Sequence, residues 1–214
     1  MSLIRPFRAL RPPLEFAEKV ASPPYDVVNR AEARAIISRN PDSFMRVVRS
    51  DAEFPENVDP YAPEIYSRAA ENFLSLIQRG FLVRDETPSF YLYTLLQGEH
   101  KQTGLMAGTS CREYIDGAIR RHEHTRRVKE DDRARHIATI NANSGPVLLT
   151  YPADREIDAL VHKCTETVPV ADFQDEAGIH YIVHRVSDTV LVEEFVRLFA
   201  RIPVLFVADG HHRS

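Results

Sequence analysis

Charged side chains and histidines, which can bind ligands or transfer protons, are most concentrated in the segment RRHEHTRRVKEDDRARH, residues 120–136. It holds seven Arg or Lys, four acids and three histidines, so its formal charge is +3 with histidine neutral. Guanidinium and ammonium groups bind phosphate oxygens, and the free amides of a helix N-terminus bind the same anions. We therefore expect phosphate contacts from His122, Arg126 and Lys129, with Glu123 as a candidate catalytic base or metal ligand.

The same segment could instead form an ordinary solvated helix. Asp131 with Arg135, and Glu130 with Arg133, have the spacing of surface ion pairs. Cations in the first turn of a helix cost roughly 0.3–1 kcal/mol each, and a bound anion would offset that cost. Spacing alone does not decide between the two interpretations.

A second candidate is VADGHHR, near the end of the chain. Gly210 after a strand allows a sharp turn and a close approach of ligand to backbone. Arg213 offers a planar fork of donors suited to phosphate, and His211 and His212 could donate or exchange protons near neutral pH. We expect these four residues to bind phosphate, and Asp209 to be a candidate catalytic carboxylate. The alternative is an edge strand ending in a polar turn.

A third candidate is SPPYDVV, in which Pro23 and Pro24 stiffen a loop that presents Tyr25 and Asp26. Asp26 is a further candidate base. The alternative is a structural turn in which Asp26 accepts from nearby amides.

The sequence favours neither a protein-bound metal nor a covalent nucleophile. His122 and His124 flank one residue, which is not the H-E-x-x-H spacing that places two ligands on one helical face. No G-x-S-x-G, P-loop or G-x-G-x-x-G pattern occurs. Cys111, in a predicted strand, and Cys164, in a predicted helix, are expected to be packing residues.

Local signals predict the elements that carry these residues. Asn29 with Glu32 forms a capping-box pattern for a helix that ends at Asn40-Pro41. SFMRVVRS is predicted to be a strand, and a long amphipathic helix is expected to end at Gly80. Thr125 is the predicted N-cap of a helix over 126–141.

The remaining segments predict mainly antiparallel strands. FLVR, SFYLYTLLQ and KQTGLMAGTSCREY suit a meander, and VPVADFQ with GIHYIVHRV suits a hairpin. PVLLTYP and PVLFVADG add two strands, and DREIDALVHKCTE and TVLVEEFVRLFARI add two helices. The predicted fold is α+β, with an antiparallel and mixed sheet and flanking helices.

Size and composition set further limits. A chain of 214 residues with 43% apolar residues can bury a core as one medium domain or two small ones. We expect one region over residues 1–214, with a sub-boundary near 145–150. The net charge of −4 argues against a generally basic, DNA-coating protein. Two distant cysteines, no apolar run long enough for a membrane span and no signal peptide predict a cytoplasmic protein.

Several segments occur in an order that resembles a known family. They are IRPFRALRP, ASPPYDVV, QTGLMA, RRHEHTRRVKEDDRARH, SGPVLLTY and VADGHHR. Together they resemble family 1015 among bacterial and archaeal domains of unknown function, over essentially the whole chain. RRHEHTRR departs from the family, where a lysine and an HE-x-T core are expected. Members usually continue past VADGHHR, which implies that this chain is the N-terminal region of a longer protein.

The resemblance also implies a phosphate-binding role. Members have been labelled as related to ParB-type partitioning proteins, and G-H-H-R is similar to the phosphate-binding turn of the ParB and sulfiredoxin-like superfamily. That superfamily includes CTP-dependent DNA clamps, sulfinic-acid reductases and free-serine kinases. The likeness implies phosphate contacts from Gly210, His211, His212 and Arg213, and a partly ParB-like fold. The reductases have a cysteine where His211 stands, so sulfinic reduction is not expected.

The function expected is a nucleotide-dependent phosphotransferase acting on a small molecule, with ATP, ADP or CTP and magnesium as cofactors. A nucleotide-regulated DNA-binding protein of the partition type is the second candidate. The charge of −4 and the lack of a helix-turn-helix pattern weigh against it. A non-catalytic scaffold is the third. The expected partners are a nucleotide and a small-molecule substrate; the oligomeric state and the substrate stay open, and no membrane partner is expected.

Overall fold

The computed structural model describes residues 4–121 and 125–213, which fall into two compact units. Unit 1 contains the described residues of Met1–Glu18, Val83–His122 and Leu148–Asp209. Unit 2 contains those of Lys19–Leu82, Glu123–Val147 and Gly210–Ser214. Each unit is therefore assembled from three separate stretches of chain. Helices and strands are mixed and the sheets are antiparallel or mixed, so the predicted α+β class is confirmed.

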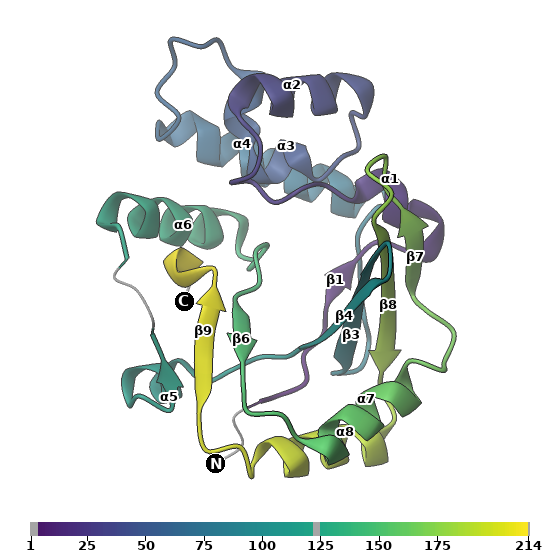
Figure 1. Cartoon of the computed structure of the whole chain (residues 1–214). Coiled ribbons are helices and arrows are strands. Elements are labelled where there is room, and N and C mark those ends of the chain that lie inside the picture. The colour runs from purple at the N-terminus through teal and green to yellow at the C-terminus, as the bar shows by residue number, and fades with distance from the viewer. Residues whose placement is uncertain (1–3, 122–124, 214) are drawn as a thin grey trace. The chain divides into compact units, whose positions relative to one another are not determined.

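Unit 1 contains three sheets (Figure 1). The largest is antiparallel in the order β4-β3-β8-β7, and a smaller mixed sheet has the order β5-β9-β6, with β5 parallel to β9. The third is the antiparallel pair β1-β2. The strands are β1 (Leu10–Arg11), β2 (Val83–Arg84), β3 (Phe90–Gln97), β4 (His100–Met106), β5 (Ile119–Arg120), β6 (Leu148–Thr150), β7 (Ala171–Gln174), β8 (His180–Val186) and β9 (Leu205–Asp209).

The core of unit 1 lies between the four-stranded sheet and its helices. Phe90 and Phe195 are both fully buried, and their rings meet edge to face with centroids 5.8 Å apart. The helices assigned to this unit are α5 (Cys111–Ile115), α7 (Arg155–Cys164) and α8 (Thr189–Phe199). The two predicted hairpins, β3-β4 and β7-β8, are confirmed.

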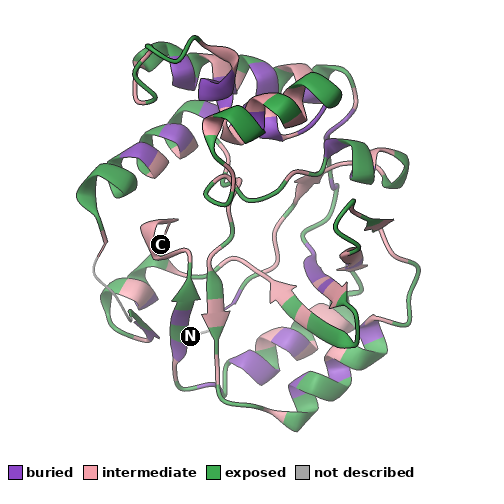
Figure 2. Cartoon of the chain, turned by 45° about the horizontal axis from the view of Figure 1, so that its top comes forward, coloured by how far each residue is buried: buried purple, intermediate pink, exposed green. Residues whose placement is uncertain are grey.

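Unit 2 is helical. Its helices are α2 (Arg30–Arg39), α3 (Met45–Val48), α4 (Pro63–Gln78) and α6 (Arg127–Ile140), with the 3-10 helices η2 (Ser50–Glu53) and η3 (His211–Arg213). The short α1 (Ala17–Val20) spans the change from unit 1 to unit 2, and η1 (Leu14–Phe16) precedes it. Buried and exposed bands alternate along the helices (Figure 2), as expected for amphipathic helices around a core.

The local signals for α2 and α4 were correct. Asn29 accepts from the amide of Glu32, and the Glu32 carboxylate accepts from the amide of Asn29, so the capping box is complete. Gly80 follows α4 with φ of +76°, a conformation that favours glycine. In α4, Ile65, Ala69, Phe73 and Leu76 are buried on one face, so the helix is amphipathic as predicted, and Ile77 beside them is half-buried.

Four local predictions were wrong. SFMRVVRS is not a strand, because Met45 is fully buried in a helical core cluster with Ala33 and Ala52. Thr125 does not cap α6: Arg126 is the N-cap residue, and Thr125 donates to Glu130 instead. The strand in FLVR pairs with β1 rather than joining the meander, and CREY begins α5, with Cys111 exposed in it.

Among the described residues, none of the helices has both the length and the apolar character needed to cross a membrane.

Candidate functional site

Unit 2 contains a cleft of about 560 Å³. That volume falls in the range of roughly 300–1,000 Å³ typical of small-molecule sites. It is lined by the residues Tyr25, Asp26, Val28, Arg30, Val48, Arg49, Ser50, Asp51, Pro60, Tyr61, Ile65, Tyr66, Arg126, Lys129, Asp132, Arg133, His136 and His212. Five cationic side chains stand against three carboxylates in this lining, so the cleft is electropositive although the whole chain is acidic.

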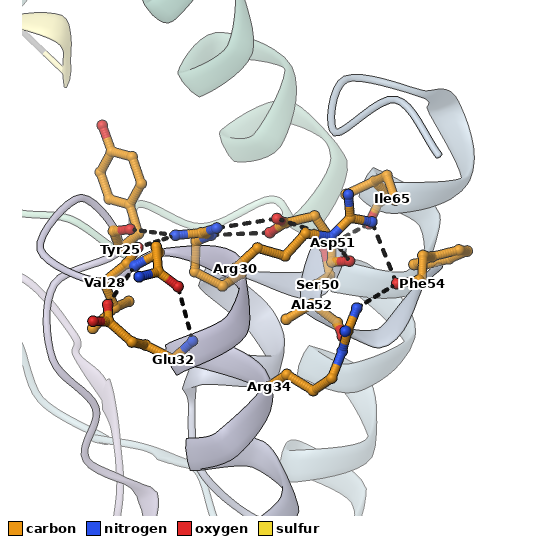
Figure 3. Close-up of polar contacts among 12 residues, drawn as sticks. Tyr25, Val28, Arg30, Glu32, Arg34, Ser50, Asp51, Ala52, Phe54 and Ile65 are labelled. Carbon is orange, nitrogen blue, oxygen red and sulfur yellow. Dashed lines mark hydrogen bonds and ion pairs between the residues drawn. The ribbon is translucent and has the colours of Figure 1, made fainter. Parts of the chain in front are cut away.

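Arg49 holds the proline-stiffened loop at one side of the cleft. Its Nε and Nη2 donate to the two carboxylate oxygens of Asp51, at 2.9 and 3.1 Å. Its Nη1 donates to the main-chain carbonyls of Tyr25, at 3.1 Å, and Val28. Figure 3 shows Tyr25 and Val28 on one side of this bridge and Asp51 on the other. Arg49 therefore fixes the position of Tyr25 and Asp26. Its own Nε, Nη1 and Nη2 groups donate to protein acceptors.

Arg30 is also a structural cation. Its guanidinium donates to the carbonyl of Asp51 at 3.0 Å (Figure 3). It also donates to the carbonyls of Pro55 and Val58, at 2.9 and 3.2 Å, which ties the start of α2 to the loop after η2. Because carbonyls already occupy its donors, Arg30 adds charge to the cleft without a free fork for a ligand.

A buried network of hydrogen bonds supports the lining of the cleft. Tyr66 in α4 donates its hydroxyl to Asp132 Oδ1 at 2.8 Å, and Arg133 donates to Asp132 Oδ2 from Nε at 3.0 Å and from Nη2 at 2.7 Å. Burial, then the bond to Asp132, raises the pKa of Tyr66 to about 12, so the phenol stays protonated. The guanidinium carbon of Arg133 lies 4.2 Å from the centre of the Tyr25 ring. This network joins α4, α6 and the loop into one wall.

His136 is a buried residue of the cleft lining. Its Nε2 lies 2.9 Å from the carbonyl oxygen of Val47 in α3. Burial is the main cause that lowers its pKa, so the ring is neutral near pH 7. His136 is thus suited to packing and hydrogen bonding rather than to carrying positive charge.

Arg126 and Lys129 are the accessible cations of the cleft. Both are exposed, and neither side chain forms an ion pair with another of the described residues. Lys129 Nζ lies over the Tyr61 ring at 5.9 Å, a loose contact. Arg126 is the N-cap residue of α6, where no side chain caps the helix, and its amide donates to Nδ1 of His212 at 3.4 Å. The positive end of the helix dipole and two cations therefore meet at one place.

Gly145 and Gly210 lie so close to the Arg213 side chain that only a residue without a Cβ fits at either position. A Cβ on Gly145 would lie 2.8 Å from Arg213 Cδ, and one on Gly210 would lie 2.7 Å from its Nη2. Gly210 also has φ of +80°, which favours glycine. The Arg213 side chain is 12% exposed, and its Nη1 lies 3.7 Å from Asp26 Oδ2. Arg213 is therefore confined by its surroundings and paired with an exposed carboxylate.

Four residues proposed from the sequence line this one cleft, namely Asp26, Arg126, Lys129 and His212. Arg213 is joined to them through Asp26, and the ring of His211 lies 4.1 Å from that of His212. Asp209 is the last residue of β9 in unit 1 and does not line the cleft. His122 and Glu123 lie outside the described residues.

Sequence reasoning missed the supporting residues of the site, above all Arg49, Tyr66 and Asp132. The predicted surface pairs of α6 are replaced by others: Arg133 binds Asp132, and Asp131 faces Arg127 at 3.9 Å. A signal was present, since Asp132, His136 and Ile140 repeat every four residues and all are buried.

The arrangement suits a bound anion with more than one oxygen. Two accessible cations, a histidine and the N-terminus of a 14-residue helix approach the same space from two stretches of chain. Asp26 adds an exposed carboxylate beside them. Such a site can hold phosphate groups and place a proton acceptor next to them.

Comparison with known proteins gives one match. The model of a family described as "Protein of unknown function (DUF1015)" matches residues 4–214. No curated protein and no solved structure matches the chain.

Proposed function

Because the chain belongs to the DUF1015 family of proteins of unknown function, whose description assigns no activity, we propose a function from the cleft itself. The cleft of unit 2 binds the phosphates of a nucleotide, and the protein is a nucleotide-dependent phosphotransferase acting on a small hydroxyl-bearing molecule. One observation carries this proposal: Arg126, Lys129 and His212, from two distant stretches of chain, line one cleft with the carboxylate of Asp26.

The cations of the cleft fall into two groups, those that bind protein acceptors and those that can bind a ligand. Arg30, Arg49 and Arg133 are occupied by protein acceptors, and they set the shape and potential of the cleft. Arg126 and Lys129 remain available to a ligand. Charge-assisted hydrogen bonds to phosphate are roughly twice as strong as neutral ones, and the helix N-terminus adds its amides. The nucleotide would arrive as its magnesium complex.

Transfer needs a group that orients the acceptor hydroxyl and takes its proton. Asp26 is suited to this role, because it is exposed, lines the cleft and is held by Arg213 and by the loop that Arg49 fixes. The acceptor oxygen forms a bond to the terminal phosphorus, the bond from that phosphorus to the leaving diphosphate breaks, and the hydroxyl proton passes to Asp26.

Calorimetric titration tests the binding step. ATP, ADP, CTP and GTP are each titrated into the full chain with and without magnesium, and the double variant R126A/K129A is compared with wild type. The expected loss is at least tenfold in affinity, since a hydrogen bond to a charged group contributes about 1.5–3 kcal/mol. Arg127, which is 93% exposed and lines neither the cleft nor the neighbouring pocket described below, supplies the control R127A.

Transfer of labelled phosphate from the bound nucleotide to a pool of small hydroxyl compounds tests the catalytic step. Absence of binding by all four nucleotides would refute the proposal. Binding without transfer, together with salt-sensitive retention of DNA, would favour a nucleotide-regulated DNA-binding protein instead.

A further inference from the structure

A second, smaller pocket of about 190 Å³ adjoins the cleft within unit 2. It is called the side pocket here and is lined by Tyr61, Tyr66, Val128, Asp131, Asp132 and Arg135. Tyr61, Tyr66 and Asp132 line the cleft as well, so the two spaces share a wall.

We propose that the side pocket holds the base of the nucleotide whose phosphates occupy the cleft, and that it selects a base with an exocyclic amino group. The inference rests on the proposed function, because it assigns the second half of the same ligand.

The two spaces lie along adjacent faces of one helix. Val128, Asp131, Asp132 and Arg135 follow the spacing i, i+3, i+4, i+7 in α6, and all line the side pocket. Lys129, Asp132, Arg133 and His136 follow the same spacing one residue later, and all line the cleft. A ligand that follows the surface of α6 would therefore contact both.

The side pocket offers aromatic and apolar surface to a planar ring. Tyr61 contributes an aromatic side chain, and the contact made with its ring by another described residue is the loose one of Lys129, at 5.9 Å. Val128, in the first turn of α6, is 63% exposed and presents an aliphatic surface to the solvent. Stacking on an aromatic side chain contributes to base binding whatever the base. The remaining aromatic ring, Tyr66, is already faced by Arg135 at 5.3 Å.

The polar groups of the side pocket point to a hydrogen-bond donor on the ligand. Both oxygens of Asp132 already accept from Tyr66 and Arg133. Asp131 is 68% exposed, and among the described residues its carboxylate forms an ion pair with Arg127 alone, at 3.9 Å, so it is open to a further donor. Adenine, cytosine and guanine carry an exocyclic amino group that can donate to a carboxylate.

The charges of the two spaces differ in sign. The side pocket has two carboxylates and one guanidinium, whereas the cleft has five cations and three carboxylates. Phosphates are therefore favoured in the cleft, and an uncharged donor-bearing ring is favoured in the side pocket. The smaller volume also suits one ring system rather than a complete nucleotide.

The test compares a nucleotide with its phosphates alone. ATP and inorganic tripolyphosphate are titrated calorimetrically into wild type, Y61A and the ring-retaining control Y61F. We expect Y61A to lower ATP affinity on the order of ten- to hundredfold, from the loss of one stacking contact. Tripolyphosphate affinity should change less than threefold in Y61A, and both ligands should bind Y61F as they bind wild type.

Base selection is tested with ITP, which carries a carbonyl oxygen where ATP carries the amino group. Wild type should prefer ATP, and D131A should remove most of that preference. E64Q is the matched control, because exposed Glu64 is in the same unit and lines neither space.

The outcomes separate the two proposals. If neither ATP nor tripolyphosphate binds wild type, the proposed function fails, and the base site fails with it. If both bind equally well and Y61A changes neither, phosphate binding stands and the base site is wrong. Loss of tripolyphosphate binding in Y61A equal to the loss of ATP binding would also refute the base site.

Discussion

The backbone amide of Arg126 donates to Nδ1 of His212 at 3.4 Å, although 86 residues separate the two in the chain. The contact joins the N-terminus of α6 to the turn that begins at Gly210 within unit 2. The contact brings together two segments that were each predicted to bind phosphate.

Replacing Asp26 should separate binding from transfer. In D26N the carboxylate charge is removed beside Arg213, so tripolyphosphate should bind a few-fold more tightly, because a repulsive charge is gone. Transfer should fall by about 10²- to 10⁴-fold, the usual contribution of a general base. Calorimetry and labelled-phosphate transfer measure the two effects. E64Q changes the charge equally and should leave transfer intact; wild-type transfer in D26N would exclude Asp26 as the base.

Gly145 should matter for ligand binding more than for stability. The new Cβ in G145A would lie 2.8 Å from Arg213 Cδ, so the Arg213 side chain must leave the position in which its Nη1 lies 3.7 Å from Asp26 Oδ2. We expect the affinity for tripolyphosphate to fall by about tenfold with a change in melting temperature of a few degrees. G104A is the control, since a Cβ on Gly104 meets nothing within 4 Å. Unchanged affinity in G145A would show that the position of Arg213 is not needed.

The buried Tyr66–Asp132–Arg133 network should be the most sensitive polar feature of unit 2. Y66F removes one hydrogen bond to a charged group and should lower the free energy of unfolding by about 1.5–3 kcal/mol. D132A leaves the Arg133 charge, which is 11% exposed, without its partner and should cost about 3–5 kcal/mol.

Urea unfolding measures both effects on the network. R127A is the control, because it breaks only an exposed pair and should change the unfolding free energy by less than about 0.5 kcal/mol. Equal effects of D132A and R127A would contradict the structural role assigned to the network.

Unfolding should become easier between about pH 7 and pH 5, partly because of His136. Burial is the first cause that lowers its pKa, and Arg133 lowers it further, against the opposing effects of the Val47 carbonyl and Asp132. Below the unfolded pKa of about 6.5 the unfolded chain binds a proton that the folded ring does not, so the unfolding free energy falls by up to about 1.4 kcal/mol per pH unit.

The matched measurement is urea unfolding of wild type and H136Q at pH 8, 7, 6 and 5. The slope should be smaller in H136Q, and part of it should remain, because burial also lowers the pKa of His184 in unit 1. Asp42 and Asp85, whose pKa values are lowered, contribute only below about pH 4. Identical slopes in the two proteins would exclude His136 as a source of the pH dependence.

A helix or strand could be predicted from the sequence where neighbouring residues alone determine it. The capping box of Asn29 and Glu32 acts over four residues, and the start of α2 followed from it. The sequence was insufficient for α3, because the valines of SFMRVVRS favour a strand while the burial of Met45 against Ala33 and Ala52 selects a helix. Tertiary packing overrode local propensity there.

The residue types of the candidate site could be named from the sequence, but their arrangement in space could not. Phosphate chemistry identified Arg126, Lys129 and the Gly210 turn, but no spacing rule brings together residues 86 positions apart. The residues that shape the cleft, Arg49 and Asp132, resemble ordinary surface charges in sequence. Only their hydrogen bonds to buried partners, Asp51 and Tyr66, distinguish them.

An NMR titration tests most directly whether the two distant segments bind phosphate together. Inorganic tripolyphosphate is titrated into the ¹⁵N-labelled chain, and amide chemical shifts are followed by NMR. If the two segments form one site, Arg126, Arg127 and Val128 and also His212 and Arg213 should show saturable shifts with one dissociation constant. Shifts confined to one of the two segments, or spread over exposed lysines and arginines without saturation, would contradict this expectation.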